Sequence, residues 1–225
     1  SLLCLEAGKA VLCEKPFTIN EAEAKVVVEY ARSKGVFLME AMWTRFLPAT
    51  CKVRQWIAEG RIGAPRMVIA DFGFRAGNVD PKARLFDPNL GGGGLLDVGV
   101  YAVSYASMIF GCEPERVACF ADIGETGVDE QAAMMIHYGK NKLASLTTGV
   151  RTSTPHEAWI LGETGRIAVP APFWSTTKAR LETKEPETFE EPHLSNGYEY
   201  QAREVGKCLA EGRIELEELH RFENG

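Results

Sequence analysis

The feature that most constrains this chain is a strand–helix–strand pattern close to its start. Two apolar runs, AVLCE at 10–14 and VFLMEA at 36–41, flank a helix predicted over 21–34. Asn20 and Glu23 form a capping-box pattern at the start of that helix. Short runs that are apolar at consecutive positions are typical of buried parallel strands. Together the three segments indicate a βαβ unit of a doubly wound α/β sheet.

The pattern changes after the second apolar run. A helix is predicted over 48–59, a strand over 66–75 and a long helix over 95–110. The strands predicted after these lie at 115–122, 131–138, 142–151, 156–162 and 166–170. Successive strands without helices between them indicate an antiparallel sheet. One face of this sheet should pack on helices, and the other face could pair with a second subunit.

The C-terminal part is more polar. Residues 183–197 are rich in proline and charge, which predicts a surface loop. A closing helix is predicted over 198–211, and residues 215–225 have the pattern of a further helix. The predicted architecture is therefore α/β plus α+β: the tail of a parallel, doubly wound domain, followed by an α+β domain with an open, mainly antiparallel sheet.

Composition excludes several function classes. The 225 residues carry a net charge of -6, and their lysines and arginines are scattered, so nucleic acid is not an expected partner. No apolar run approaches the roughly 18–20 residues that cross a bilayer, so we predict a cytoplasmic protein without a membrane partner. The cysteines lack CxxC pairs and should be reduced and buried. The histidines match no zinc spacing, so no metal site is expected.

The first strand ends in Glu14, Lys15 and Pro16. Ligands of doubly wound sheets bind outside the carboxyl ends of the strands, so Lys15 should lie over such a crevice. Pro16 biases the residue before it toward an extended conformation, which holds the lysine stem. An ammonium there could hold a substrate hydroxyl, lower the pKa of a neighbouring acid or complement an alkoxide. The alternative is a surface lysine before a turn, which spacing alone favours.

The stretch GGGGLLDVGVY at 91–101 is the second candidate. Its glycines should let backbone approach a ligand or another element of the protein, and should expose free N–H groups at a helix start. Asp97 and Tyr101 are four residues apart and so share a helix face, where a carboxylate and a phenol could share a proton. A tyrosine of pKa near 10 is a poor base at neutral pH, and a nearby lysine could lower that pKa. An Asp near a helix N-terminus plus a core tyrosine explains this helix equally well.

Aromatic residues supply the remaining candidates. Trp43 follows the carboxyl end of the second strand as Lys15 follows that of the first, so both should face one crevice. Arg45 beside it offers donors to a phosphate or a ribose. Phe72 and Trp174 are further candidates, although an aromatic side chain is more often core than pocket.

Three motifs, taken in order, carry a resemblance to a known family. They are EKP at 14–16, EAMWTRFLP at 40–48 and GGGGLLDVGVY at 91–101. Over nearly its whole length the chain resembles the glucose-fructose oxidoreductase / inositol dehydrogenase family, often written Gfo/Idh/MocA. Within the family, EAMWTRFLP and ADFGFR at 70–75 are most similar to the dimeric dihydrodiol dehydrogenases and the NADP-dependent D-xylose dehydrogenases.

The resemblance implies a domain division, a cofactor and residue roles. Residues 1–45 would be the C-terminal part of an NAD(P)-binding Rossmann domain, and residues 46–225 the substrate domain, whose open sheet commonly forms a homodimer. The implied cofactor is NADP or NAD, with NADP favoured. The implied cofactor contacts are Glu14, Lys15, Pro16, Trp43 and Arg45. The implied catalytic residues are Lys15, Asp97 and Tyr101, with Tyr101 as acid/base, and the implied substrate contacts are Trp43, Phe72 and Trp174.

One departure from the family is large, because no GxGxxG turn precedes the EKP strand. We therefore expect a fragment, truncated at both ends, that lacks the dinucleotide phosphate site and binds the cofactor weakly on its own. The full-length form is predicted to move hydride between C4 of a nicotinamide and a carbinol carbon of a vicinal diol or sugar. The alternatives are a non-catalytic sensor of dinucleotide or sugar, and a plain dimerisation module.

Overall fold

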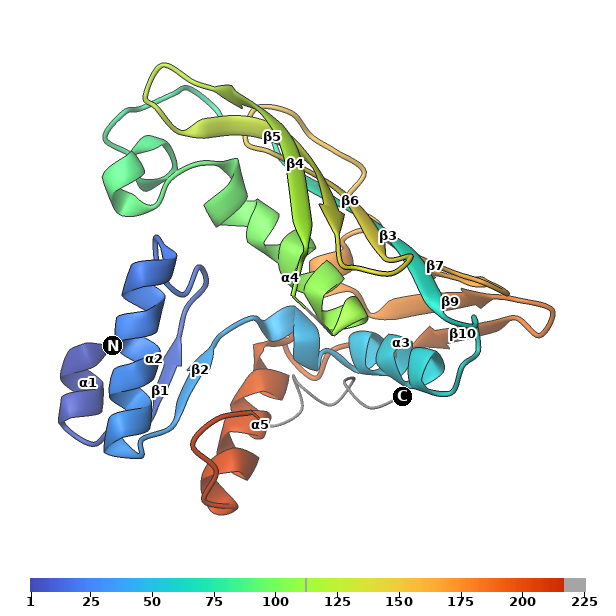
Figure 1. Cartoon of the computed structure of the whole chain (residues 1–225), viewed down its shortest axis with the longest axis horizontal. Coiled ribbons are helices and arrows are strands. Elements are labelled where there is room, and N and C mark those ends of the chain that lie inside the picture. Colours follow the sequence, from blue (N-terminus) through green and yellow to red (C-terminus); the bar gives the residue numbers. More distant parts are fainter. Residues whose placement is uncertain (112, 217–225) are drawn as a thin grey trace.

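The computed structural model describes residues 1–111 and 113–216. Figure 1 shows two parts: a small α/β unit built from the start of the chain, and a broad sheet with helices along one face. The helix expected over 215–225 falls almost entirely outside the described residues.

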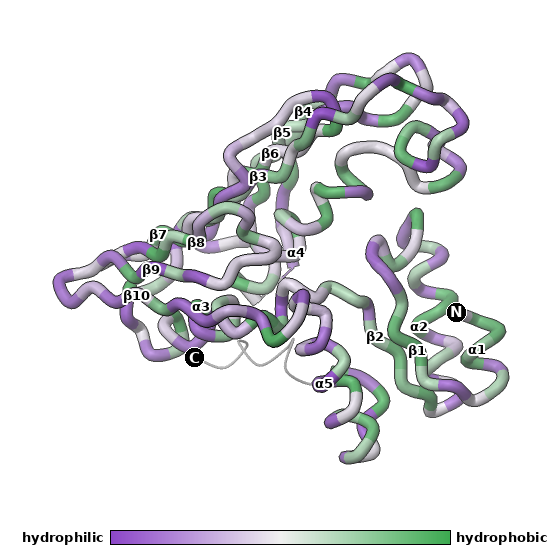
Figure 2. Tube along the Cα trace, turned by 180° about the vertical axis from the view of Figure 1, so that it is seen from behind, coloured by the Kyte–Doolittle hydropathy of each residue, from purple (hydrophilic) through white to green (hydrophobic). Residues whose placement is uncertain are grey.

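The small unit contains the predicted strand–helix–strand pattern. Strand β1 (Val11–Cys13) pairs in parallel with β2 (Leu38–Glu40), and helix α2 (Glu21–Lys34) connects them. Helix α1 (Leu2–Glu6) packs against α2. Figure 2 shows β1 as a hydrophobic stretch that turns hydrophilic beyond its end. Because the two strands are parallel, their carboxyl ends lie at the same edge.

Local hydrogen bonds explain why α2 starts and ends where the sequence predicts. The Asn20 side chain accepts the backbone N–H of Glu23 at 2.9 Å, and the Glu23 carboxylate accepts the N–H of Ile19 at 3.2 Å. This is a variant of the capping box, in which the Glu23 carboxylate accepts the N–H of the residue before the N-cap. Gly35 ends the helix with φ +61°, a left-handed conformation that favours glycine.

The broad sheet has eight strands within the described residues, in the order β10-β9-β8-β7-β3-β6-β5-β4. These strands are β3 (Pro65–Gly73), β4 (Arg116–Ile123), β5 (Asp129–His137), β6 (Leu143–Gly149), β7 (Ala158–Gly162), β8 (Arg166–Val169), β9 (Lys178–Glu182) and β10 (Glu187–Glu190). β3 and β6 are parallel, and every other neighbouring pair is antiparallel. The predicted fold class is confirmed.

Two helices cover one face of this sheet. Helix α4 (Val100–Phe110) lies against β3 and β6, and α3 (Pro48–Ala58) lies against β9 and β10 (Figure 1). Trp56, Leu146 and Ile160 are fully buried in this layer. Burial of such apolar side chains, worth about 1.5–3 kcal/mol each, fixes α4 on the sheet.

Helix α5 (Tyr198–Ala210) packs against a 3-10 turn, η1 (Trp43–Phe46), next to the site described below. Further short 3-10 turns are η2 (Arg84–Phe86), η3 (Pro88–Leu90) and η5 (Phe173–Ser175).

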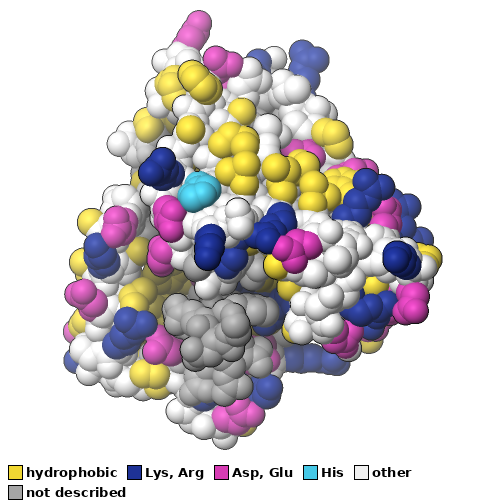
Figure 3. Space-filling view, turned by 45° about the vertical axis from the view of Figure 1, so that its right-hand side comes forward, with side chains coloured by type: hydrophobic (Ala, Val, Ile, Leu, Met, Phe, Trp, Pro, Cys, Tyr) yellow, Lys and Arg dark blue, Asp and Glu magenta, His cyan; other side chains and the backbone are white. Residues whose placement is uncertain are grey.

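The opposite face of the sheet carries exposed apolar side chains. The pairing register places Phe120, Met135 and Ile69 on this face, with exposed fractions of 87%, 42% and 40%. Figure 3 shows a group of apolar side chains in the upper half of its view, bordered by charged ones.

Two element predictions were wrong. The loop predicted over 183–197 contains β10, which pairs with β9, a strand that was not predicted. The helix predicted over 95–110 starts with a π turn, η4 (Leu95–Gly99), and becomes α-helical at Val100.

Two composition-based expectations also need correction. Among the cysteines described, Cys208 is buried, whereas Cys4, Cys51 and Cys119 are exposed. By length and composition alone, the stretch Pro88–Phe110 could cross a membrane, which we did not expect. However, 61% of its most apolar 18-residue segment is buried inside the protein. That burial is typical of a core helix.

Candidate active site

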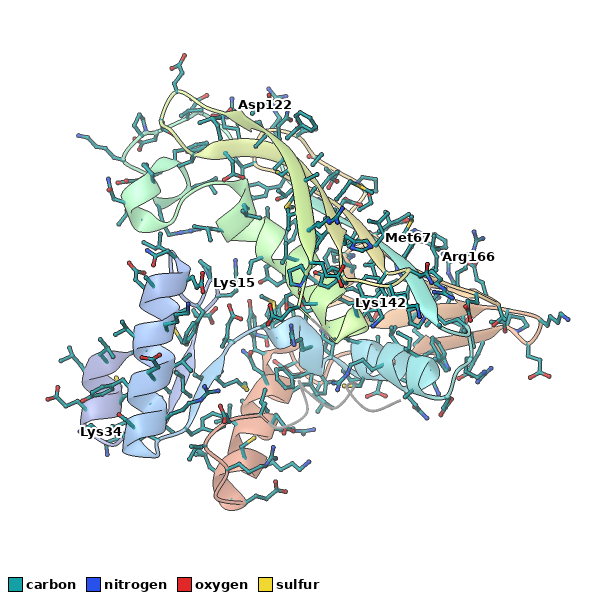
Figure 4. All side chains as sticks on the ribbon, in the orientation of Figure 1. Lys15, Lys34, Met67, Asp122, Lys142 and Arg166 are labelled. Atoms are coloured by element: carbon teal, nitrogen blue, oxygen red, sulfur yellow. The ribbon has the colours of Figure 1, made fainter. Side chains whose placement is uncertain are left out.

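Lys15 lies just beyond β1 and reaches across to the start of α4. Its Nζ donates a hydrogen bond to the backbone carbonyl of Asp97 at 2.6 Å and lies 4.9 Å from the ring centroid of Tyr101. Figure 4 shows this side chain in the space between the small unit and the sheet domain. Burial lowers the pKa of Lys15 below its usual 10.5, opposed by Asp97 and reinforced by Arg84. The lysine and the phenol therefore meet at one place.

Tyr101 lies in the first turn of α4 and is buried, with 7% of its surface exposed. Its hydroxyl accepts the indole N–H of Trp43 at 3.1 Å. Burial raises the pKa of Tyr101 to about 12, and the Trp43 N–H partly opposes this. The expected lowering by Lys15 is not seen, because Nζ lies over the ring face. At neutral pH the phenol is protonated and suited to donate a proton.

The carboxylate of Asp97 forms an ion pair with Arg84. The expectation that Asp97 and Tyr101 share a proton assumed regular α-helical spacing, whereas Asp97 lies in the π turn η4. In the described structure the polar partner of the Tyr101 hydroxyl is Trp43, and Asp97 acts on Lys15 through its backbone carbonyl and its charge.

The glycine run approaches another element, which is one of the two alternatives predicted for it, but its N–H groups are not free. The carboxylate of Asp129, at the start of β5, accepts the Leu95 N–H at 2.7 Å. The helix start that was expected to offer free N–H groups to a ligand is therefore occupied by a side chain of the protein itself.

Aromatic side chains line the space beside Tyr101. Phe72 and Trp174 stack with ring centroids 3.3 Å apart and ring planes 3° from parallel, and the Tyr101 ring lies 5.5 Å from Phe72 and 6.4 Å from Trp174. His156 meets both edge-on, at 5.4 and 4.8 Å. Its Nε2 bonds to the Gly73 carbonyl. The structure thus groups the two predicted substrate aromatics around the phenol.

Trp43 lies on the other side of the phenol. Its ring stacks on Tyr198 at a centroid distance of 4.6 Å, and Tyr198 begins helix α5. Trp43 therefore connects the start of α5 with the Tyr101 hydroxyl. Trp43 and Lys15 both contact Tyr101, while a crevice shared by the two and the role of Trp43 stay predictions.

The remaining predicted cofactor residues lie in two places. Glu14 and Pro16 line the same cavity as Lys15. The Arg45 guanidinium instead contacts Ser104 on α4, through Nε to the side chain at 3.0 Å and through a terminal nitrogen to the carbonyl at 3.2 Å. The structure gives Arg45 an internal role, and no contact in the described residues ties it to a ligand site.

A cavity of about 1000 Å³ runs from Lys15 and Asp97 along helix α2. Apolar side chains such as Ile19 and Val26 make up most of its wall, and Lys15 and Arg84 bring positive charge to one end. Ligand pockets commonly combine such apolar walls with a few placed polar groups.

Three residues at this site escaped prediction: Arg84, His156 and Tyr198. Arg84 and Tyr198 lie in polar stretches that show no recognisable motif. His156 has φ +66°, in the left-handed region that histidine visits more readily than most residues. The sequence does not reveal that conformation. The contacts of all three residues depend on segments that only the tertiary structure brings together.

Comparison with known proteins agrees with this geometry. A family model described as "GFO/IDH/MocA C-terminal domain" matches residues 50–168, and one described as "Oxidoreductase family, NAD-binding Rossmann fold" matches residues 2–42. The chain belongs to the Gfo/Idh/MocA family. The predicted resemblance is confirmed. The two matches fall on either side of the predicted boundary at 45/46, which itself stays a prediction.

Similar curated proteins are named trans-1,2-dihydrobenzene-1,2-diol dehydrogenase. The Mus musculus protein is 40% identical over 220 residues, covering 94% of this chain and 65% of the relative. The Homo sapiens protein is 37% identical over 222 residues, covering 95% of this chain and 66% of the relative. The chain thus spans slightly less than two thirds of the length of these Gfo/Idh/MocA relatives.

Solved structures share the fold. An aldose-aldose oxidoreductase from Caulobacter crescentus, complexed with glycerol, has a TM-score of 0.85 at 23% identity, covering 94% of this chain and 65% of its own. The open conformation of KijD10, a 3-ketoreductase from Actinomadura kijaniata in complex with TDP-benzene and NADP, has a TM-score of 0.79 at 25% identity, covering 97% and 67%.

Proposed function

We propose that this protein is an NAD(P)-dependent oxidoreductase that interconverts a CH–OH group of a vicinal diol or sugar and the corresponding carbonyl. The observation that carries the proposal is the meeting of Lys15 and Tyr101 beside the Phe72–Trp174 pair. A charged amine, a protonated phenol and flat apolar walls suit a neutral substrate that carries hydroxyl groups.

The residues around the cavity fit the nicotinamide end of a cofactor. The cavity wall is mostly apolar and reaches the carboxyl end of β1, where ligands of doubly wound sheets bind. Glu14, Lys15 and Pro16 would hold that end. A bound nicotinamide would supply or accept the hydride at its C4. NADP is the favoured form, supported by its presence in the KijD10 complex.

The side chains of the chain have distinct parts in the proposed reaction. In the direction of reduction, the carbonyl oxygen gains negative charge and takes the phenolic proton of Tyr101. Lys15, whose ammonium lies 4.9 Å from the Tyr101 ring, would stabilise the negative charge that develops on the substrate oxygen. The N–H of Trp43 donates to the Tyr101 oxygen, which favours the phenolate that remains. Phe72 and Trp174 wall the substrate against water.

Two further predictions belong to this proposal. A second copy of the chain would cover the open sheet face around Phe120, giving a homodimer. The cytoplasmic location predicted from composition is retained as part of the same proposal.

Turnover assays test the proposal. The full-length form is assayed with NADP and with NAD on trans-1,2-dihydrobenzene-1,2-diol, the substrate in the relatives' name, and on D-xylose. We expect NADP-dependent oxidation of at least one substrate, and a loss of about 10²–10⁴-fold in kcat/KM for Tyr101→Phe and for Lys15→Met. Dinucleotide binding without turnover would support the sensor alternative instead, and activity of both variants within a few-fold of wild type would refute the residue roles.

A further inference from the structure

Asp129 fills the inside of the glycine turn that leads into α4. Its carboxylate accepts the N–H of Leu95 at 2.7 Å, and the N–H of Gly94 also donates to it. From the neighbouring strand β6, the Thr148 hydroxyl donates to the carbonyl of Gly94 at 3.0 Å. Two strands of the sheet therefore hold this turn by its polar backbone groups.

The sequence of the turn permits this approach. Gly93 has φ +104°, which side-chain-bearing residues rarely adopt, and a Cβ there would overlap the Asp129 carboxylate. A Cβ at Gly94 would lie 3.1 Å from the same carboxylate. Two of the four glycines in the motif are thus explained by the space that Asp129 needs.

The turn is connected directly to the candidate catalytic lysine. Leu95, held by Asp129, is the first residue of the π turn η4, and the carbonyl two residues later, that of Asp97, accepts the Lys15 Nζ at 2.6 Å. A shift of the turn would move this carbonyl and the ammonium that is bonded to it.

We propose that Asp129 is a positioning residue, which fixes the turn that presents the Asp97 carbonyl to Lys15 and so holds the ammonium over Tyr101. The effect on turnover rests on the proposed function, whereas the effect on Lys15 itself does not. Because the carboxylate occupies the N–H groups of Gly94 and Leu95, the same geometry removes this helix start as an anion site.

Lysine labelling tests the connection without requiring activity. Each variant is treated with N-hydroxysuccinimidyl acetate, and the acetylation rates of Lys15 and Lys142 are read by peptide mass spectrometry. Lys142 is an internal reference, because its Nζ also donates to a backbone carbonyl, that of Phe110 at 3.2 Å, at the far end of α4 (Figure 4). The Lys15/Lys142 rate ratio therefore separates a local change at the turn from a general loosening of the fold.

We expect Asp129→Ala to raise this ratio at least threefold, and Asp129→Asn to raise it less, because an amide oxygen can still accept one N–H. Glu130→Gln is the matched control on the next residue of β5, whose carboxylate faces Arg151 at 3.6 Å, and should leave the ratio unchanged. An unchanged ratio in Asp129→Ala, or an equal rise in Glu130→Gln, overturns the proposal.

Gly93→Ala gives a second route, which also serves if Asp129→Ala does not fold. The added Cβ should displace the carboxylate and raise the Lys15/Lys142 ratio, and an unchanged ratio counts against the proposal. Where turnover is present, Asp129→Ala should lower kcat about 10-fold while KM stays within threefold, since misplacement of a catalytic group mainly affects the chemical step. Absence of turnover in the wild type would refute the proposed function but leave the labelling result decisive here.

Discussion

Tyr101 sets the expected pH dependence of the reaction. Burial raises the pKa of its phenol to about 12, so the phenol stays protonated from acid to weakly alkaline pH. Diol oxidation needs the phenolate, whose fraction grows about tenfold for each pH unit below that pKa. We therefore expect kcat for oxidation to rise with pH, with a slope near one on logarithmic axes. The rise should end when the pH reaches the pKa of Lys15, which burial places below its usual value of 10.5.

Carbonyl reduction uses the protonated phenol and should show no such rise. Its kcat should be flat with pH and then fall as Lys15 deprotonates. Parallel pH profiles of the two directions check this prediction. A flat profile for oxidation would mean that Tyr101 is not the group that accepts the hydroxyl proton.

Trp43 is expected to tune Tyr101 through one hydrogen bond. Trp43→Phe keeps an aromatic ring against Tyr198 but removes the N–H that lies 3.1 Å from the phenol oxygen. The variant should raise the pKa of Tyr101 further and lower kcat for oxidation by about 10-fold, the effect of about 1.4 kcal/mol. Trp159→Phe is the matched control, because the Trp159 indole, in β7, donates to Glu157 just before that strand and lies on the open sheet face with Ile69. Equal losses in both variants would contradict a specific role for Trp43.

At the residue scale, the sequence predicted which side chains meet but not how they bond. Lys15 and Trp43 both follow the carboxyl ends of parallel strands, and both contact Tyr101. The ring-face position of Lys15, the Asp97–Arg84 ion pair and the bond from Arg45 to Ser104 depend on the packing of distant elements. No local pattern encodes them.

At the scale of the elements, the start of helix α2 follows from a local sequence signal, the N-cap residue Asn20. Asn20→Ala removes the acceptor of the Glu23 N–H and should lower the free energy of unfolding by about 1 kcal/mol. This corresponds to a fall in Tm of about 2–4 °C for a chain of this size. Asn20→Asp, which retains an oxygen acceptor at the helix N-terminus, should stay close to wild type. Thermal unfolding of both variants checks this, and a loss of similar size in Asn20→Asp would contradict the capping account.

Three elements were missed for identifiable reasons. Strands β9 and β10 are short and rich in charge, and only alternate residues such as Ala179 and Leu181 are buried. Five residues give too few repeats to establish a period of two beside a proline-rich stretch. The π turn η4 could not be predicted because Asp129, which holds its first residue, lies 34 residues further along the chain.

At the scale of the whole molecule, the open sheet face predicts how two copies of the chain assemble. Phe120 is 87% exposed in the middle of β4, so we expect it to lie in the proposed homodimer interface. Phe120→Glu should place a charge in that interface and shift the protein from dimer to monomer in light scattering. Ala202→Glu, at an exposed position on helix α5 and outside the sheet, is the control that should remain dimeric. A monomeric wild type would contradict the prediction.

The most direct test of the whole account is a double-mutant cycle on Lys15 and Tyr101, because the proposed site requires them to act on one proton. With kcat measured for wild type, Lys15→Met, Tyr101→Phe and the double variant, we expect the double variant to be no more than a few-fold slower than the slower single variant. If the two losses instead multiply, the residues act independently, and the proposed shared site is contradicted.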